Sequence, residues 1–96
     1  MSTTPEGTRC VSYRMVPHGR SHGRCYAPAV YEARARRDGR LTWRFATNPM
    51  GLVWVNGRCM PAGHWTPTAA ARSAKLLAEE LGLEFIPGVR HGTPVR

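Results

Sequence analysis

The sequence predicts a single α+β domain, in which an antiparallel β-meander of four to five strands carries one C-terminal helix on its apolar face. Alternating apolar and polar residues over 10–16 and 30–47 indicate half-buried strands. One amphipathic stretch over 67–81 indicates a helix. Because the chain has 96 residues, it is too short for a second core. We therefore expect a flexible N-terminal arm over 1–9, the domain over 10–86 and a basic C-terminal tail over 87–96.

The clearest element is a hairpin in the stretch VYEARARRDGRLTWRFAT, residues 30–47. A two-residue turn would mix apolar and polar residues on both faces, whereas a three-residue loop over 37–39 separates them. In the longer loop Gly39 is the third residue, a position that requires the left-handed backbone conformation. We therefore expect the apolar pairs Ala35–Leu41, Ala33–Trp43 and Tyr31–Phe45 on one face, and four arginines on the other: Arg34, Arg36, Arg40 and Arg44.

The remaining elements have weaker but specific signals. Asn56 and Gly57 form the favoured pair for a tight turn, which predicts a second hairpin with Val55 opposite Arg58. The stretch LEFI, residues 83–86, is expected to add a short edge strand. The predicted helix has Thr66 as N-cap and Gly82 after its last turn. Its apolar stripe consists of Ala70, Ala74, Leu77 and Leu81.

The charge of the chain is strongly one-sided. Arginine and lysine number 14 against 6 acidic residues, for a net charge of +8, and every basic residue except Lys75 is arginine. Such an excess favours polyanionic partners, and arginine suits phosphate and base contacts. A GC-rich genome, such as that of an actinobacterium or its phage, also encodes many arginines, so composition alone leaves both explanations open.

A two-stranded ribbon with one arginine face can lie against a phosphate backbone or enter the major groove of DNA. The face is expected to bind nucleic acid together with Arg20 and Arg24, which lie in the loop VPHGRSHGRC. Any antiparallel sheet must also have a polar solvent face. However, like charges at Arg36 and Arg40 are unfavourable when unpartnered, which favours a binding role.

The order of strands 30–37, 40–47 and 52–56 followed by helix 67–81 is similar to that of the arm-binding domains of tyrosine integrases and plant ethylene-response-factor domains. The similarity covers about half of the chain and rests on element order. It implies DNA binding through the sheet by the four arginines of the hairpin. It also fits a small regulator of phage or mobile-element origin.

The main alternative is a protein-interaction module or inhibitor of phage type that docks on an acidic host protein. The same positive charge serves this function. Trp54 and Arg58 on the second hairpin are the candidate interface residues, since an aromatic anchor is typical of protein interfaces.

No cofactor is expected, although a structural zinc ion is the alternative for the histidine-rich loop. The weak candidate ligands are Cys10, His18, His22 and Cys25, or Cys25 with Cys59 and His64. These spacings match no zinc finger or knuckle, and a cysteine also serves as a small buried apolar residue.

The sequence suggests no enzyme, because it contains no nucleophile elbow, phosphate loop or metalloprotease motif. A cysteine–histidine pair that meets only in space stays open. No secretory segment or membrane span is evident, and the three cysteines suggest reduced thiols in the cytoplasm. No small-molecule substrate is evident either.

Overall fold

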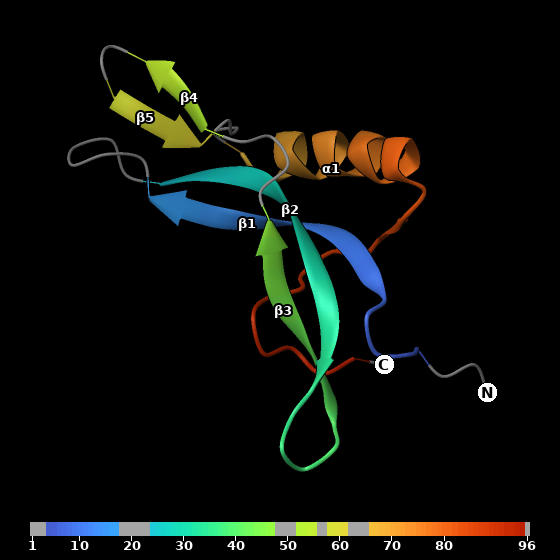
Figure 1. Ribbon diagram of the computed structural model, residues 1–96. Coiled ribbons are helices and arrows are strands. Elements are labelled where there is room, and N and C mark those ends of the chain that lie inside the picture. Colours follow the sequence, from blue (N-terminus) through green and yellow to red (C-terminus); the bar gives the residue numbers. More distant parts are fainter. Residues whose placement is uncertain (1–3, 18–23, 48–51, 56–57, 62–65, 96) are drawn as a thin grey trace.

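The computed structural model describes residues 4–17, 24–47, 52–55, 58–61 and 66–95, with side chains over 4–15, 26–47 and 66–95. A four-stranded sheet has the order β3-β2-β1-β6, and a separate two-stranded sheet pairs β4 with β5. One helix packs on the larger sheet (Figure 1). The elements are β1 (Arg9–Pro17), β2 (Arg24–Ala35), β3 (Leu41–Thr47), β4 (Leu52–Val55), β5 (Arg58–Pro61), α1 (Pro67–Leu81) and β6 (Glu84–Phe85).

The hairpin formed by β2 and β3 has the predicted register. Ala35 pairs with Leu41 and Tyr31 with Phe45, and the Arg36 N–H donates to the Arg40 carbonyl at 2.8 Å. Gly39 has φ of 84°, the left-handed conformation that the three-residue loop requires. Separation of the two faces therefore identified the correct loop length.

The prediction of one antiparallel meander is wrong in two respects, although the α+β class is confirmed. The edge strand β6 is parallel to β1, because α1 intervenes as a crossover and returns the chain in the direction of β1. Strand β4 pairs with β5 across the predicted Val55–Arg58 register, but this hairpin forms its own sheet. The three-strand order that resembled integrase and ethylene-response-factor domains is therefore not formed.

The predicted caps of α1 are confirmed. The Thr66 hydroxyl accepts from the Ala69 N–H, and Gly82 adopts a left-handed conformation at the C-terminus. The buried stripe differs from the prediction, because Leu81 is 48% exposed and Ala78 is buried instead. The buried residues of the helix are spaced four apart and are all alanines: Ala70, Ala74 and Ala78. Their small side chains let the helix lie close to β1 and β2.

The helix covers the face of the sheet opposite to the one that we expected. Val11 and Val30 pack against the helix alanines, and strand alternation places them on the same side as Glu32 and Arg34. The other face carries Tyr31 and the rest of a second core cluster, which consists of Cys10, Ala29, Ala33, Trp43 and Val89. The arginines thus share a face with the helix, further along the same sheet.

Residues 86–95, which we call the C-terminal segment, cover the second face where the sequence suggested a tail. Val89 is 3% exposed, and its N–H donates to the Ser12 hydroxyl at 3.3 Å. The segment then runs along the free edge of β3, where Trp43 N–H donates to the Thr93 carbonyl at 2.8 Å and Val95 N–H to the Leu41 carbonyl at 3.0 Å. It therefore blocks a sheet edge that would otherwise offer unpaired backbone groups.

The described part of the expected N-terminal arm is bonded to the end of β2. Gly7 N–H donates to the Ala33 carbonyl, and Ala33 N–H donates to the Thr8 carbonyl, both at 2.8 Å. The Ala35 N–H donates to the Glu6 carboxylate at 2.8 Å. These bonds carry the chain to Arg9, the first residue of β1, which is how an arginine of the expected arm comes to lie beside the hairpin.

Candidate nucleic-acid interface

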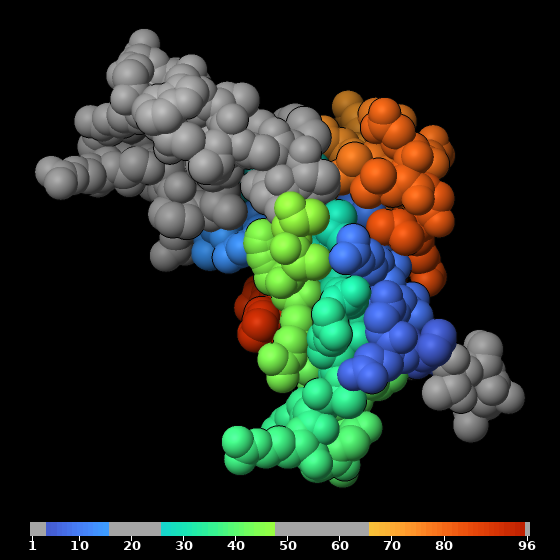
Figure 2. All heavy atoms as spheres, viewed as in Figure 1, coloured from blue at the N-terminus to red at the C-terminus, as the bar shows by residue number. Residues whose placement is uncertain are grey.

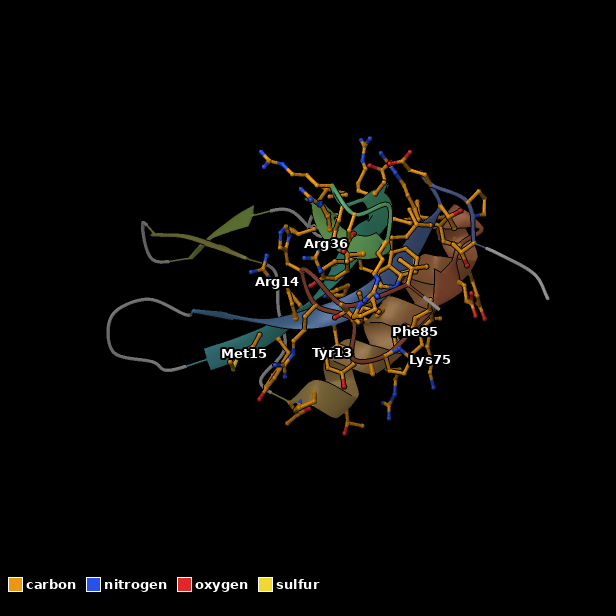
Figure 3. All side chains as sticks on the ribbon, turned by 90° about the horizontal axis from the view of Figure 1, so that it is seen from below. Tyr13, Arg14, Met15, Arg36, Lys75 and Phe85 are labelled. Carbon is orange, nitrogen blue, oxygen red and sulfur yellow. The ribbon has the colours of Figure 1, made fainter. Side chains whose placement is uncertain are left out.

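The tip of the β2–β3 hairpin projects from the body of the molecule (Figures 1 and 2). The projection arises because β2 has 12 residues and its last part extends beyond the region that α1 covers. Figure 3 shows the labelled Arg36 side chain near this end. A protruding ribbon of this kind can approach an extended partner without a clash from the rest of the domain.

Five exposed arginines lie on one side of this ribbon. Strand register places Arg34 beside Thr42, and Arg44 beside Glu32. Arg9 joins them from β1, where it pairs with Glu32. We call this set the arginine cluster: Arg9, Arg34, Arg36, Arg40 and Arg44, all of which are exposed.

Glu32 is the carboxylate at the inner end of the cluster. Its side chain is 16% exposed and contacts the Arg34 guanidinium at 2.7 Å and that of Arg9 at 3.4 Å. Arg44 lies opposite Glu32 in the strand register but forms none of the ion pairs found among the described residues. The carboxylate instead holds Arg34 on its own strand and Arg9 across the sheet, which orients both guanidinium groups along the face.

The other two nearby carboxylates are engaged with the backbone. Asp38 accepts from the Arg40 N–H at 3.0 Å and so closes the loop, while Glu6 accepts from Ala35 N–H. With Arg37 in the loop, six arginines face three carboxylates in this part of the described structure. Arg36, Arg40 and Arg44 form none of the ion pairs found among the described residues, so their donors remain available to phosphate.

The other predicted binding residues cannot be added to this surface. Arg20 lies outside the described residues. Arg24 begins β2, while Trp54 and Arg58 belong to β4 and β5, but their side chains are not among those described. They stay predictions.

The candidate zinc set is divided by the strand register. Cys10 lies opposite Tyr31, whereas Cys25 lies opposite Val16. Six residues of strand therefore separate them, a span of about 20 Å, and two thiolates cannot share a zinc ion at ~2.3 Å each over that distance. His18, His22 and His64 lie outside the described residues, and the side chains of Cys25 and Cys59 are not described.

Cys10 belongs to the core. It is 1% exposed, and burial, with a smaller contribution from the Glu84 carboxylate, raises the pKa of its thiol to about 12. A neutral, covered thiol is a poor nucleophile and a poor metal ligand. Across the described part of the chain, no three histidine, cysteine or acidic side chains gather as a metal site.

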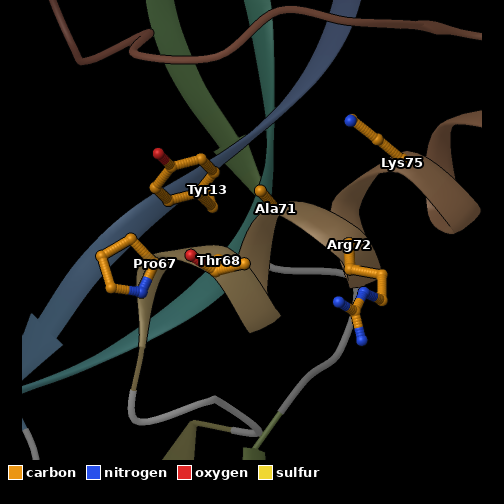
Figure 4. A pocket seen from close by; sticks show the side chains of 6 residues that line it. All are labelled: Tyr13, Pro67, Thr68, Ala71, Arg72 and Lys75. Carbon is orange, nitrogen blue, oxygen red and sulfur yellow. The ribbon is translucent and has the colours of Figure 1, made fainter.

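A second basic surface lies between α1 and β1. Arg72 and Lys75 line an open hollow of about 380 Å³ with Tyr13 and the first turn of the helix (Figure 4). The Lys75 ammonium lies 5.7 Å from the centroid of the Phe85 ring. This surface has two basic side chains, fewer than the hairpin. Substitutions here can therefore serve as controls for substitutions in the hairpin.

Comparisons of the chain with protein-family models, with curated proteins and with solved structures give no match. The helix in the described part of the chain does not have the length and apolar character to cross a membrane.

Proposed function

We propose that the protein binds nucleic acid without catalysing a reaction and grips the phosphate backbone with its arginine cluster. The observation that supports this proposal is the convergence of Arg36, Arg40 and Arg44 on one side of a projecting ribbon with no described ion-pair partner. Adjacent guanidinium groups repel one another in the free protein, and phosphates spaced along a strand relieve that repulsion.

The shape of the surface also favours this function. A two-stranded antiparallel ribbon fits the major groove of DNA, where arginine donates two hydrogen bonds to guanine. Glu32 pairs with Arg34 and Arg9 and so competes with phosphate for these two side chains, whereas Arg36, Arg40 and Arg44 have no such competitor among the described residues. The arginines thus supply phosphate contacts, and those closest to the tip are the candidates for base contacts.

The test is the affinity of the double variant Arg36→Ala with Arg40→Ala for duplex DNA and for single-stranded RNA. Each lost charge-assisted contact should weaken binding by about tenfold, while the fold should be retained because both side chains are exposed. The matched control is Arg72→Ala with Lys75→Ala, which removes the same charge from α1.

Equal weakening by the two double variants would contradict a specific hairpin surface and indicate attraction to net charge alone. The alternative, docking on an acidic protein, is tested by capturing partners from the lysate of a host with a GC-rich genome, with and without nuclease. A partner retained after nuclease digestion would favour docking on an acidic protein and overturn the proposal.

A further inference from the structure

A hollow of about 720 Å³ lies beside β1, and none of the residues that line it belongs to the arginine cluster. It is bordered by β1, β2 and β3 and by the C-terminal segment, and its volume is in the range of small-molecule sites, roughly 300–1,000 Å³. No pattern in the sequence indicates this hollow, because residues 87–96 were expected to form a tail. Its chemistry comes from the side chains of Arg14, Tyr31, Phe45, Val89, Arg90 and His91.

One wall is aromatic and cationic. The Phe45 ring lies 6.0 Å from the Tyr31 ring, centroid to centroid, with the two planes at 49°. The Arg14 guanidinium carbon lies 4.5 Å from the Phe45 centroid. Rings and guanidinium planes of this kind form stacking surfaces for a planar ligand, and a cation favours one with an electron-rich ring.

The hollow also gathers hydrogen-bond donors. The Phe45 N–H donates to His91 Nδ1 at 3.4 Å, and an imidazole that accepts at Nδ1 carries its proton on Nε2, which remains a donor. Arg90 contributes a guanidinium group from an exposed position. None of the described residues that line the hollow is acidic, so its charge complements an anion.

The Tyr31 hydroxyl is the third donor. The residue is 2% exposed, and its hydroxyl has no hydrogen-bond partner among the described residues. Burial raises the pKa of this phenol, while Arg14 and Arg90 are close enough to act in the opposite direction. The hydroxyl therefore keeps its proton at neutral pH, and a buried donor without a partner is unfavourable until something accepts from it.

We propose that this hollow binds a nucleotide-like ligand, in which a planar aromatic ring is joined to a phosphate. The ring stacks on the wall formed by Arg14 and Phe45, and the phosphate accepts from Arg90, His91 and the Tyr31 hydroxyl. The ligand is either a free nucleotide or one residue of a single strand, since both present the same ring and phosphate. The inference is independent of the arginine cluster, because the two surfaces share no residue.

The test is a titration of isotope-labelled protein with adenosine monophosphate, adenosine and inorganic phosphate, followed through the backbone amide signals of Phe45, Val89 and Arg90. The nucleotide should give saturable shifts, with adenosine and phosphate each binding at least about tenfold more weakly because each offers half of the contacts. Displacement of the nucleotide by a single-stranded oligonucleotide would identify the strand as the source. Failure to displace it would identify the free nucleotide.

Variants locate the site. Arg90→Ala should weaken nucleotide binding about tenfold, and Tyr31→Phe should weaken it without lowering the midpoint of denaturation, because it removes an unpartnered hydroxyl. Arg72→Ala, the matched loss of one exposed arginine on α1, should leave it unchanged.

The absence of saturable shifts at millimolar nucleotide, or equal effects of the Arg90 and Arg72 variants, would overturn the proposal. The double variant at Arg36 and Arg40 should not alter nucleotide binding in the hollow. This experiment therefore fails or succeeds separately from the proposed function.

Discussion

The substitution Val89→Ala tests whether the C-terminal segment is an integral part of the fold. The Val89 side chain is 3% exposed and belongs to the core cluster that includes Trp43 and Tyr31. The change removes two methyl groups, worth about 0.8 kcal/mol each by transfer, and leaves a small cavity. We expect the free energy of unfolding to fall by about 2 kcal/mol, a large part of the ~5–14 kcal/mol typical of a chain of this size.

The assay is urea denaturation followed by tryptophan fluorescence, with thermal unfolding as a second measurement. A loss of about 2 kcal/mol corresponds to roughly 8–16 °C in Tm for a domain under 100 residues. Arg90→Ala is the matched control, because the neighbouring side chain is exposed and should change stability by less than about 0.5 kcal/mol. Equal midpoints for wild type and Val89→Ala would show that residues 87–95 behave as the tail that the sequence suggested, and would refute the packing.

Three further predictions concern the turn, the buried thiol and the acidic residue of the cluster. Gly39→Val should lower the free energy of unfolding by about 1–2 kcal/mol, because φ is 84° at this residue. Gly39→Asn should lower it clearly less in the same denaturation assay, and identical losses would refute the loop geometry. The Cys10 thiol has a pKa of about 12 in the folded protein, against an ordinary value of 9.0, so the thiol of the unfolded chain loses its proton at lower pH. The free energy of unfolding should therefore fall between about pH 9 and pH 12, by up to ~1.4 kcal/mol per pH unit. A Cys10→Ala variant with the same pH slope would contradict this assignment. Glu32→Gln should strengthen binding to DNA and steepen its salt dependence, because Arg9 and Arg34 lose the carboxylate that competes with phosphate. Unchanged affinity would place the bound strand away from these two arginines.

Local patterns in the sequence were enough to predict the hairpin and the helix caps. The register of β2 and β3 followed from keeping Ala33 and Trp43 on one face, because a shift of one residue reverses every side chain. Thr66 and Gly82 occupy the predicted cap positions, since each satisfies backbone groups within the same turn of chain. Such features depend on neighbours a few residues apart, which the sequence displays directly.

Long-range pairing could not be predicted in the same way. Nothing local indicates that β6 lies parallel to β1, or that Thr93 bonds to Trp43. Residues 87–95 have polar, glycine-rich and proline-rich composition, which is typical of a loop. They join the fold through buried Val89, partly buried Val95 and backbone hydrogen bonds. The two faces of β1 and β2 are both covered, so alternation alone could not show which one receives the helix.

In the candidate site too, residues placed by local pattern were predicted, and residues placed by long-range pairing were missed. Arg34, Arg36, Arg40 and Arg44 could be placed on one face from the hairpin pattern. Arg9 was missed, because its position depends on pairing between β1 and β2. The hollow around Phe45 was missed as well, because Arg90 and His91 reach it only through the course of the C-terminal segment.

The salt dependence of binding to duplex DNA is the most direct test of phosphate contacts by the arginine cluster. The logarithm of the association constant should fall linearly with the logarithm of salt concentration, with a slope of about −0.9 for each phosphate contacted. The double variant Arg36→Ala with Arg40→Ala should therefore reduce the magnitude of the slope by about 1.8, while Arg72→Ala with Lys75→Ala should leave it unchanged. An unaltered slope in the hairpin variant would contradict phosphate binding by this surface.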